Sequence, residues 1–166
     1  EGLRLYEARW THPKVRLYKR NFDSKSWSGK ESLSCKSILL FAEGGFGDTL
    51  QLVRYAKLFD EDVELIIQCQ KPLVELVKGM GIKAEIITSS DAPPKHDYHC
   101  SLMSLPLAFG TTVGDVPRFE QYIFPSQNYL HKWRSLTSNS GNAKIGIVAR
   151  GSVSHKNDRN RSMDLE

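Results

Sequence analysis

Short apolar runs alternate with helix-length amphipathic segments through the middle of the chain. Residues 37–42 (SILLFA) are a continuous apolar run, which is typical of a strand buried on both faces of a parallel sheet. Residues 49–59 then place their apolar side chains on one stripe, as a helix packed on a sheet does. Residues 63–69 and 84–88 repeat the strand pattern, and residues 72–80 predict a second helix that begins at a proline. The alternation predicts βαβ units, and hence an α/β fold with a Rossmann-like parallel sheet and flanking helices.

The segments before and after this pattern differ in character. The first ten residues have bulky apolar side chains at helical spacing and predict a helix whose partner helix is missing: Leu3, Leu5, Tyr6 and Trp10. Residues 11–36 are polar, basic and serine-rich, and predict a surface linker that Trp27 pins down. Residues 97–110 predict a short extended stretch that runs into a brief helix, and residues 127–136 predict another helix.

The last part of the chain predicts the beginning of a new unit. SNSGN at 138–142 has the composition of a linker, and residues 144–149 (KIGIVA) predict a strand with a polar loop behind it. Because a parallel strand needs a neighbour, we expect the chain to stop within a domain. The expected organisation is therefore a helix with a linker over 1–36, a Rossmann-like lobe over 37–140, and the first strand and loop of a second lobe over 141–166.

Charge and composition narrow the function classes. The net charge is +4, but residues 37–143 hold nine Lys/Arg against twelve acids, so the basic excess lies on the flanks. This distribution argues against a broad nucleic-acid-binding face. There is no apolar run long enough to cross a membrane and no signal-peptide layout. Three cysteines at irregular spacing argue against a disulfide framework, and we expect a cytoplasmic protein without an integral membrane segment.

The turn EGGFGDT at 43–49 is the first candidate site. It lies between a predicted strand and a predicted helix, where open α/β sheets bind ligands. It is not a phosphate-binding P-loop, because no Gly-Lys-Ser/Thr ending is present. Leu50 stands where a dinucleotide fingerprint has its third glycine, and the next strand ends in Gln68 and Gln70 rather than an acid, which disfavours an NAD-type dehydrogenase.

Asp48 is the residue of this turn with the clearest chemistry, and two interpretations are open. It is either a carboxylate that caps the following helix or a general base that takes a proton from an acceptor hydroxyl. Its neighbours are the candidate substrate contacts, since glycines let a ligand approach the backbone: Gly44, Gly45, Phe46, Gly47, Thr49 and Gln51.

A second candidate site follows the last predicted strand. The loop offers cations and short hydrogen-bonding side chains that suit a diphosphate, and its candidate donor-phosphate ligands are His155, Lys156, Asn157, Arg159, Arg161 and Ser162. The alternative is a solvated surface loop. HDYHC carries His96, His99 and Cys100, but no second ligand pair accompanies them, so no metal site is expected.

Four stretches, LRLYEARW, FAEGGFGDTLQLVRY, DYHCSLMSLPLAFGTT and HKNDRNRS, resemble the bacterial glycosyltransferase domains that follow tetratricopeptide (TPR) repeats. These domains are similar to O-linked N-acetylglucosamine transferases and, more distantly, to lipopolysaccharide heptosyltransferases. The resemblance implies a GT-B architecture, with a first lobe that holds the acceptor and a second that binds the nucleotide sugar. It also implies that LRLYEARW is the last helix of a repeat array, that Asp48 is the catalytic base, and that HKNDRNRS lies near the donor diphosphate. Ala149 and Arg150 depart from the tryptophan and small residue that relatives often carry.

Two functions are expected from these observations. The first is a metal-independent glycosyltransferase fragment without a cofactor, whose co-substrate is a UDP- or other NDP-sugar and whose acceptor is a protein or a glycan. The isolated chain is then expected to be inactive, because its donor site is incomplete. The alternative is a non-catalytic protein-binding module with a degenerate transferase lobe. An unpaired final strand predicts association of the chain through its exposed strand edge.

Overall fold

The computed structural model describes residues 1–13, 20–137, 145–153 and 156–163. It divides into two compact units, Glu1–Ser126 and Gln127–Glu166, and each is described by itself.

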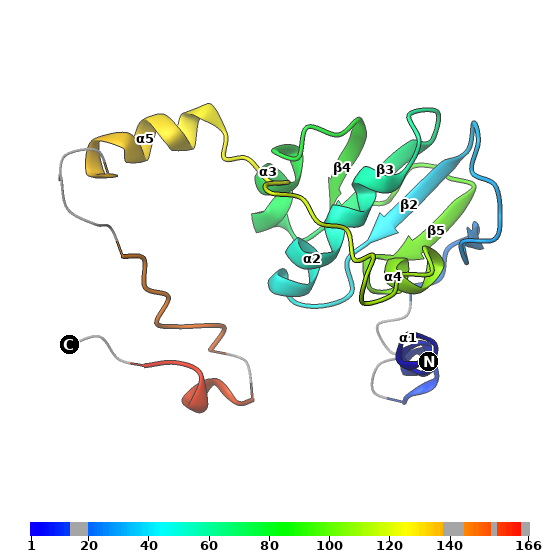
Figure 1. The fold of residues 1–166 in the computed structure, drawn as a ribbon, viewed down its shortest axis with the longest axis horizontal. Helices are drawn as coiled ribbons and strands as arrows, with labels where there is room; N and C mark the ends of the chain where they lie inside the picture. Colours follow the sequence, from blue (N-terminus) through cyan, green and yellow to red (C-terminus); the bar gives the residue numbers. More distant parts are fainter. Residues whose placement is uncertain (14–19, 138–144, 154–155, 164–166) are drawn as a thin grey trace. The chain divides into compact units, whose positions relative to one another are not determined.

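The first unit is built on a five-stranded sheet with flanking helices (Figure 1). All neighbouring strands are parallel, and their order is β1-β5-β2-β3-β4. The strands are β1 (Lys25–Ser26), β2 (Ser37–Phe41), β3 (Glu64–Cys69), β4 (Ala84–Thr88) and β5 (Tyr98–Ser101). The predicted α/β fold with a Rossmann-like parallel sheet is therefore confirmed.

The connections between strands follow the predicted helices closely. Between β2 and β3 run α2 (Phe46–Leu52) and the 3-10 helix η3 (Val53–Leu58). Between β3 and β4 run η4 (Lys71–Leu73), with a proline in its first turn, and α3 (Val74–Lys78). The remaining helices of this unit are α1 (Gly2–Tyr6), η1 (Glu7–Thr11), η5 (Leu102–Ser104) and α4 (Leu105–Ala108).

The core lies between the sheet and the helices α2, η3 and α3, which cover one face of it (Figure 1). Ile38, Leu40 and Ile67 point into this core and are fully buried, and Val53 and Val77 meet them from the helices. Burial of these side chains contributes about 1.5–3 kcal/mol each. Leu39 and Ile66, on the alternate positions of the same strands, are also buried, which explains why both strands read as continuous apolar runs.

The segment before β2 contributes more to the fold than a linker does. Trp27 is buried, as predicted for an anchor, and its ring contacts Phe59 and Phe109 at centroid distances of 5.4 Å. The strand β1 was not predicted, because two polar residues carry no hydrophobic pattern. It forms because the backbone N–H of Lys25 donates to Asp97 O at 3.2 Å and the N–H of Trp27, which follows β1, donates to His99 O at 2.9 Å.

The second unit contains the predicted helix, α5 (Gln127–Thr137), and the 3-10 helix η6 (Asp158–Asn160). The strand predicted over 144–149 is wrong for the described residues 145–149, which form no strand. Ile145 and Val148 are 84% and 93% exposed. The physical reason is that no described segment pairs with these residues, and a strand without a ladder partner leaves its backbone to water. The linker predicted over 138–142 lies outside the described residues.

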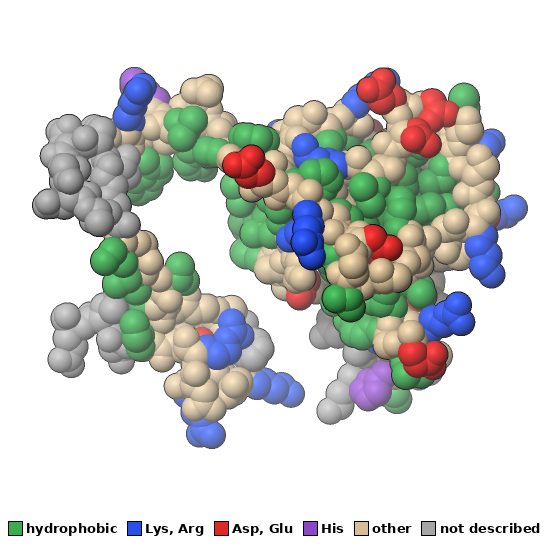
Figure 2. All heavy atoms as spheres, in the orientation of Figure 1, with side chains coloured by type: hydrophobic (Ala, Val, Ile, Leu, Met, Phe, Trp, Pro, Cys, Tyr) green, Lys and Arg blue, Asp and Glu red, His purple; other side chains and the backbone are tan. Residues whose placement is uncertain are grey.

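Charged side chains of both signs are interspersed on the face of the first unit that Figure 2 presents, without a continuous patch of one sign. In the described part of the chain, no helix has the length and apolar character needed to cross a bilayer.

Candidate functional site

The topology of the sheet creates one switch point. The chain runs from β2 through β3 to β4 in one direction and then returns to place β5 on the opposite side of β2. The connections that leave the carboxyl ends of β2 and β5 therefore diverge, and open α/β sheets bind ligands in such crevices. Glu43 and the glycine turn follow β2, and Ser101 ends β5, so the predicted turn lies at this switch point.

Asp48 lies in the first turn of α2 and is exposed. Its Oδ2 atom accepts a hydrogen bond of 2.9 Å from the backbone N–H of Gly45, the N-cap residue. In the described part of the chain, nothing donates a hydrogen bond to Oδ1. Asp48 is therefore not the N-cap residue itself, but as the N3 residue it caps the helix through one carboxylate oxygen, while the other oxygen remains accessible to a ligand.

A buried threonine, Thr49, stabilises the backbone of the turn through its side-chain hydroxyl. Thr49 is 2% exposed, and its hydroxyl lies 3.2 Å from Gly45 O and 3.0 Å from Gln70 Oε1. The Gln70 amide group in turn donates to Gly44 O at 2.9 Å. Gln70 directly follows β3, where a dinucleotide-binding domain would carry an acidic residue. In this chain the Gln70 side chain instead stabilises the backbone of the glycine turn.

The other predicted ligand contacts of the turn differ in exposure. Gly45, Phe46, Gly47 and Gln51 are exposed, and the Phe46 side chain stands half in solvent. A Cβ atom at Gly44 would lie 2.6 Å from Asp48 Oδ2, so a side chain there would displace the carboxylate. The glycine at 44 is accordingly required by the position of Asp48.

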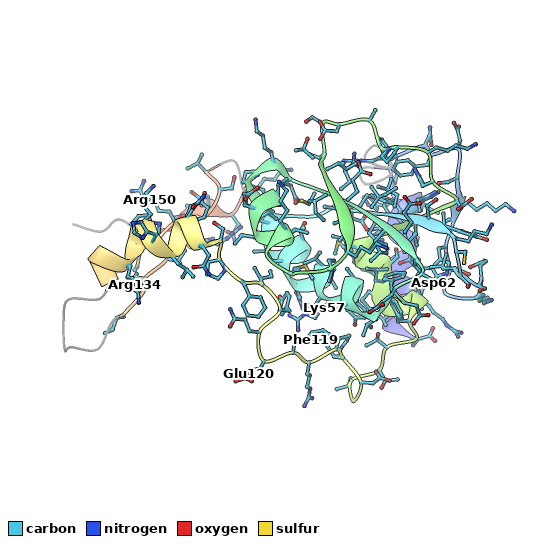
Figure 3. All side chains as sticks on the ribbon, turned by 90° about the horizontal axis from the view of Figure 1, so that it is seen from above. Lys57, Asp62, Phe119, Glu120, Arg134 and Arg150 are labelled. Carbon is cyan, nitrogen blue, oxygen red and sulfur yellow. The ribbon has the colours of Figure 1, made fainter. Side chains whose placement is uncertain are left out.

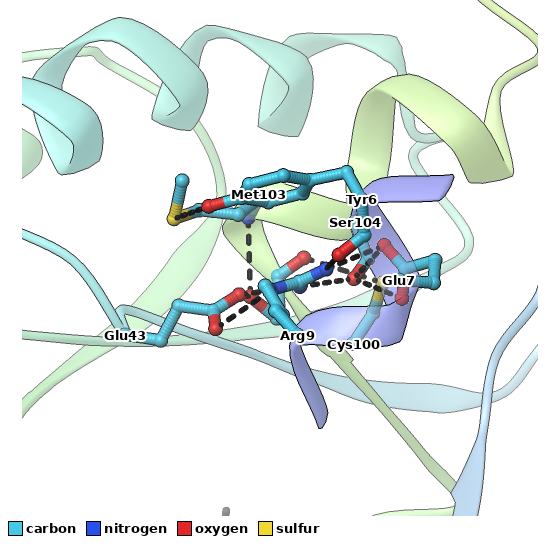
Figure 4. Close-up of polar contacts among 8 residues, drawn as sticks. Tyr6, Glu7, Arg9, Glu43, Cys100, Met103 and Ser104 are labelled. Carbon is cyan, nitrogen blue, oxygen red and sulfur yellow. Dashed lines mark hydrogen bonds and ion pairs between the residues drawn. The ribbon is translucent and has the colours of Figure 1, made fainter. Parts of the chain in front are cut away.

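A buried ion pair joins Glu43, the first residue of the turn, to Arg9 of the N-terminal helical segment (Figure 4). Arg9 donates to both carboxylate oxygens of Glu43, at 3.1 and 2.6 Å, and the two side chains are only 8% and 7% exposed. Arg9 also donates to Glu7 at 2.7 Å and to the Ser104 hydroxyl at 2.8 Å. Ser101, at the end of β5, donates to Glu43 as well. Glu43 is therefore neutralised and fully engaged in structure.

Burial and charge set the protonation of this cluster. Burial lowers the pKa of Arg9, but hydrogen bonds to Glu43 and Glu7 outweigh that effect and raise the pKa above its ordinary value. Burial raises the pKa of the Cys100 thiol, on β5 beside the cluster, to about 12. The pKa of Tyr6 is raised by burial and also by the carboxylates of Glu43 and Asp48. Arg9 stays cationic and Cys100 stays a neutral thiol near pH 7.

A cavity of about 490 Å³ lies beside this cluster. It is lined by residues of η1, of the segment before β1, of the ends of β1, β2 and β5, and of the chain that follows β5; the lining includes Glu7, Trp10, Arg20, Phe22, Phe41, His99, Ser101 and Ser104. Asp48 is not among the lining residues.

The predicted phosphate loop belongs to the second unit, so the two candidate sites are described separately. Lys156, Asn157, Arg159 and Arg161 are exposed, and Ser162 is half-buried with its hydroxyl donating to Asp158 at 2.7 Å. No described carboxylate lies within ion-pair distance of Lys156, Arg159 or Arg161. His155 lies outside the described residues.

The HDYHC segment contributes β5 rather than a ligand set. His99 and Cys100 lie within β5, and His99 Nδ1 is 2.8 Å from the Ser24 hydroxyl. Considering the described residues alone, there is no group of three or more His, Cys, Asp or Glu side chains that could hold a metal ion.

Fold and site together define a parallel α/β domain with an acidic glycine turn at its switch point. No family model, curated protein or solved structure matches the chain. The residues that tie the site together, Arg9, Glu43 and Gln70, were not predicted as a group. A sequence signal exists for Glu43 and Gln70, because each is a polar residue within two positions of the end of a buried strand. There is none for Arg9, whose partner lies far along the chain.

Proposed function

We propose that this chain is part of a GT-B-type glycosyltransferase, akin to the TPR-linked bacterial enzymes that its motifs resemble. It moves a sugar from a nucleotide-sugar donor, a UDP- or other NDP-sugar, to a hydroxyl of a protein or glycan acceptor. The first unit holds the acceptor, and the loop of the second unit supplies ligands for the donor diphosphate.

The observation that carries this proposal is the state of Asp48. Its carboxylate is exposed at the switch point of the sheet, one oxygen is fixed by Gly45 N–H, and the other has no donor among the described residues. A general base needs this combination of a fixed orientation and a lone pair within reach of the proton that it takes. Glu43, the other acid of the turn, is neutralised by Arg9 and is unsuited to this role.

The proposed reaction is a single displacement at the anomeric carbon of the donor sugar. Asp48 accepts the proton of the acceptor hydroxyl, the acceptor oxygen forms a bond to the anomeric carbon, and the bond from that carbon to the diphosphate oxygen breaks. The nucleoside diphosphate leaves with the electron pair. Lys156, Arg159 and Arg161, which have no described carboxylate partner, then stabilise its charge together with His155, Asn157 and Ser162.

Asp48→Asn is the substitution that tests the base. The asparagine oxygen can still accept the Gly45 N–H, so the turn keeps its support while the proton acceptor is lost. In the protein that carries this chain, we expect turnover of its sugar nucleotide to fall by about 10²- to 10⁴-fold. Turnover is measured as release of nucleoside diphosphate, with and without acceptor.

Asp60→Asn is the matched control, because Asp60 is an exposed acid of the same unit with no side-chain bond to the turn. Turnover that survives Asp48→Asn, with an unchanged fold by circular dichroism, would contradict the base assignment. Calorimetry against a panel of nucleotide sugars separates the alternative function, since a non-catalytic protein-binding module is expected to bind none of them.

A further inference from the structure

The cavity beside η1 has a wall of aromatic rings. Phe22 is at its centre, with ring centroids 5.2 Å from Phe41 and 4.8 Å from His99. Trp10 contacts Phe41 at a centroid distance of 6.5 Å. These four rings come from four separate segments of the chain and all line the same cavity. A flat ring placed there would gain stacking and edge-to-face contacts.

Arg20 lines the same cavity and is only partly engaged by the protein. One of its terminal nitrogens donates to Gln68, and its guanidinium lies 6.0 Å from the Phe41 ring centroid. No carboxylate of the described residues forms an ion pair with it. Arg20 is half-buried, and within the described residues its guanidinium makes no hydrogen bond beyond that to Gln68. Burial lowers the pKa of Arg20, which reflects the cost of desolvating an uncompensated cation.

The only acid that lines the cavity in the described part of the chain is Glu7. Its charge is compensated, because one oxygen lies 2.7 Å from Arg9 and the carboxylate also accepts from Ser104. Among the lining residues that the structure describes, the uncompensated charge is therefore positive and belongs to Arg20. A guanidinium with free N–H groups binds carboxylate or phosphate oxygens through charge-assisted hydrogen bonds.

We propose that this cavity is a binding site for a small organic anion that carries a flat ring. The anionic group lies on Arg20, and the ring packs against Phe22, Phe41 and His99. The site involves neither Asp48 nor the loop of the second unit, so it does not rest on the proposed transferase function.

Phenyl phosphate is the probe, because it joins one ring to one anionic group. Isothermal titration of the full chain is expected to give saturable binding at least tenfold tighter than binding of phenol or of inorganic phosphate. Arg20→Gln is expected to weaken phenyl phosphate at least tenfold, and Arg20→Lys by less. Arg118→Gln, at an exposed cation of the same unit, is the control and leaves the affinity unchanged.

A second measurement guards against variants that fail to fold. In an amide NMR titration of the unmodified chain, the resonances of Phe22, Phe41 and His99 are expected to shift with phenyl phosphate. The proposal would be overturned if phenyl phosphate bound no more tightly than phenol or inorganic phosphate. It would also be overturned if phenyl phosphate shifted amide resonances elsewhere in the first unit instead. An Arg20→Gln variant that is folded and retains full affinity would do the same.

Discussion

The end of β2 and the start of α2 each present one carboxylate, and the fold treats them in opposite ways. Glu43 is 7% exposed and accepts hydrogen bonds from Nε and Nη2 of Arg9 and from the hydroxyl of Ser101. Asp48 is exposed and receives one backbone N–H from Gly45. The contrast teaches which acid of the turn is structural and which is accessible to a substrate.

The environments explain the difference. A buried carboxylate is tolerated only when it is paired and hydrogen-bonded, so Glu43 depends on a residue from the N-terminal helix. A carboxylate in the first turn of a helix is favoured by the unpaired N–H groups there and needs no side-chain partner. Substitutions at the two carboxylates and at their partners are therefore expected to differ in their effect on the free energy of unfolding in urea.

The largest effect is expected from Arg9→Met, which keeps much of the side-chain volume and removes the charge. Glu43 would then be buried with Ser101 as its remaining partner, and breaking a buried pair from one side costs about 3–5 kcal/mol. We expect the free energy of unfolding to fall by about 3 kcal/mol.

Glu43→Gln provides the matched comparison. Arg9 keeps Glu7 as a carboxylate partner at 2.7 Å, so this variant is expected to lose less than Arg9→Met. The double variant Arg9→Met/Glu43→Gln is expected to be more stable than Arg9→Met alone, because it leaves no buried uncompensated charge at position 43, while Glu7 is 31% exposed and reaches water. Simple addition of the two single losses would contradict the account of Glu43.

Thr49→Val is expected to cost about 1–2 kcal/mol, because it deprives Gln70 Oε1 of its donor inside the fold. The substitution preserves shape, so a lost hydrogen bond is the main change. Thr112→Val at an exposed position is the control and is expected to be nearly neutral. Equal stability of the two variants would mean that the turn does not depend on its buried support.

The parallel sheet could be predicted because its central strands are buried on both faces and bounded by turns. The runs at 37–42 and 63–69 carry that signal directly, as the burial of Ile38 and Ile67 reflects. The run at 144–149 carries the same apolar pattern and forms no strand over its described residues. The apolar pattern of a segment indicates which side chains a strand would bury. Whether the strand forms depends on a neighbouring strand that pairs with its backbone.

The candidate site could be predicted only in part for a related reason. Asp48 and the glycine turn are local features of the sequence, and they lie where strand-turn-helix reasoning placed them. Arg9 lies in the N-terminal helical segment, Arg20 in the segment predicted as a polar linker and His99 on β5, and only tertiary packing brings them to the region. Contacts between residues so far apart in sequence leave no trace in spacing or composition.

Asp48→Ala is expected to cost about 1 kcal/mol, the usual loss for a helix cap, because Gly45 N–H loses its acceptor. Asp48→Asn is expected to retain nearly full stability, since its amide oxygen can replace the carboxylate oxygen. The pair therefore separates the capping role from the charge. A large loss in Asp48→Asn would place Asp48 in the same structural class as Glu43.

The smallest effect is expected where an ion pair is fully hydrated. Lys78 lies 3.0 Å from Glu75 on α3, and both side chains are more than half exposed. Such pairs gain little, because water screens the charges and two long side chains must be ordered. Lys78→Met is expected to change the free energy of unfolding by less than about 0.5 kcal/mol, against about 3 kcal/mol for the same chemical change at Arg9. Similar losses at the two positions would show that burial does not distinguish the Arg9–Glu43 pair, and the assignment of Glu43 as the structural acid would fail with it.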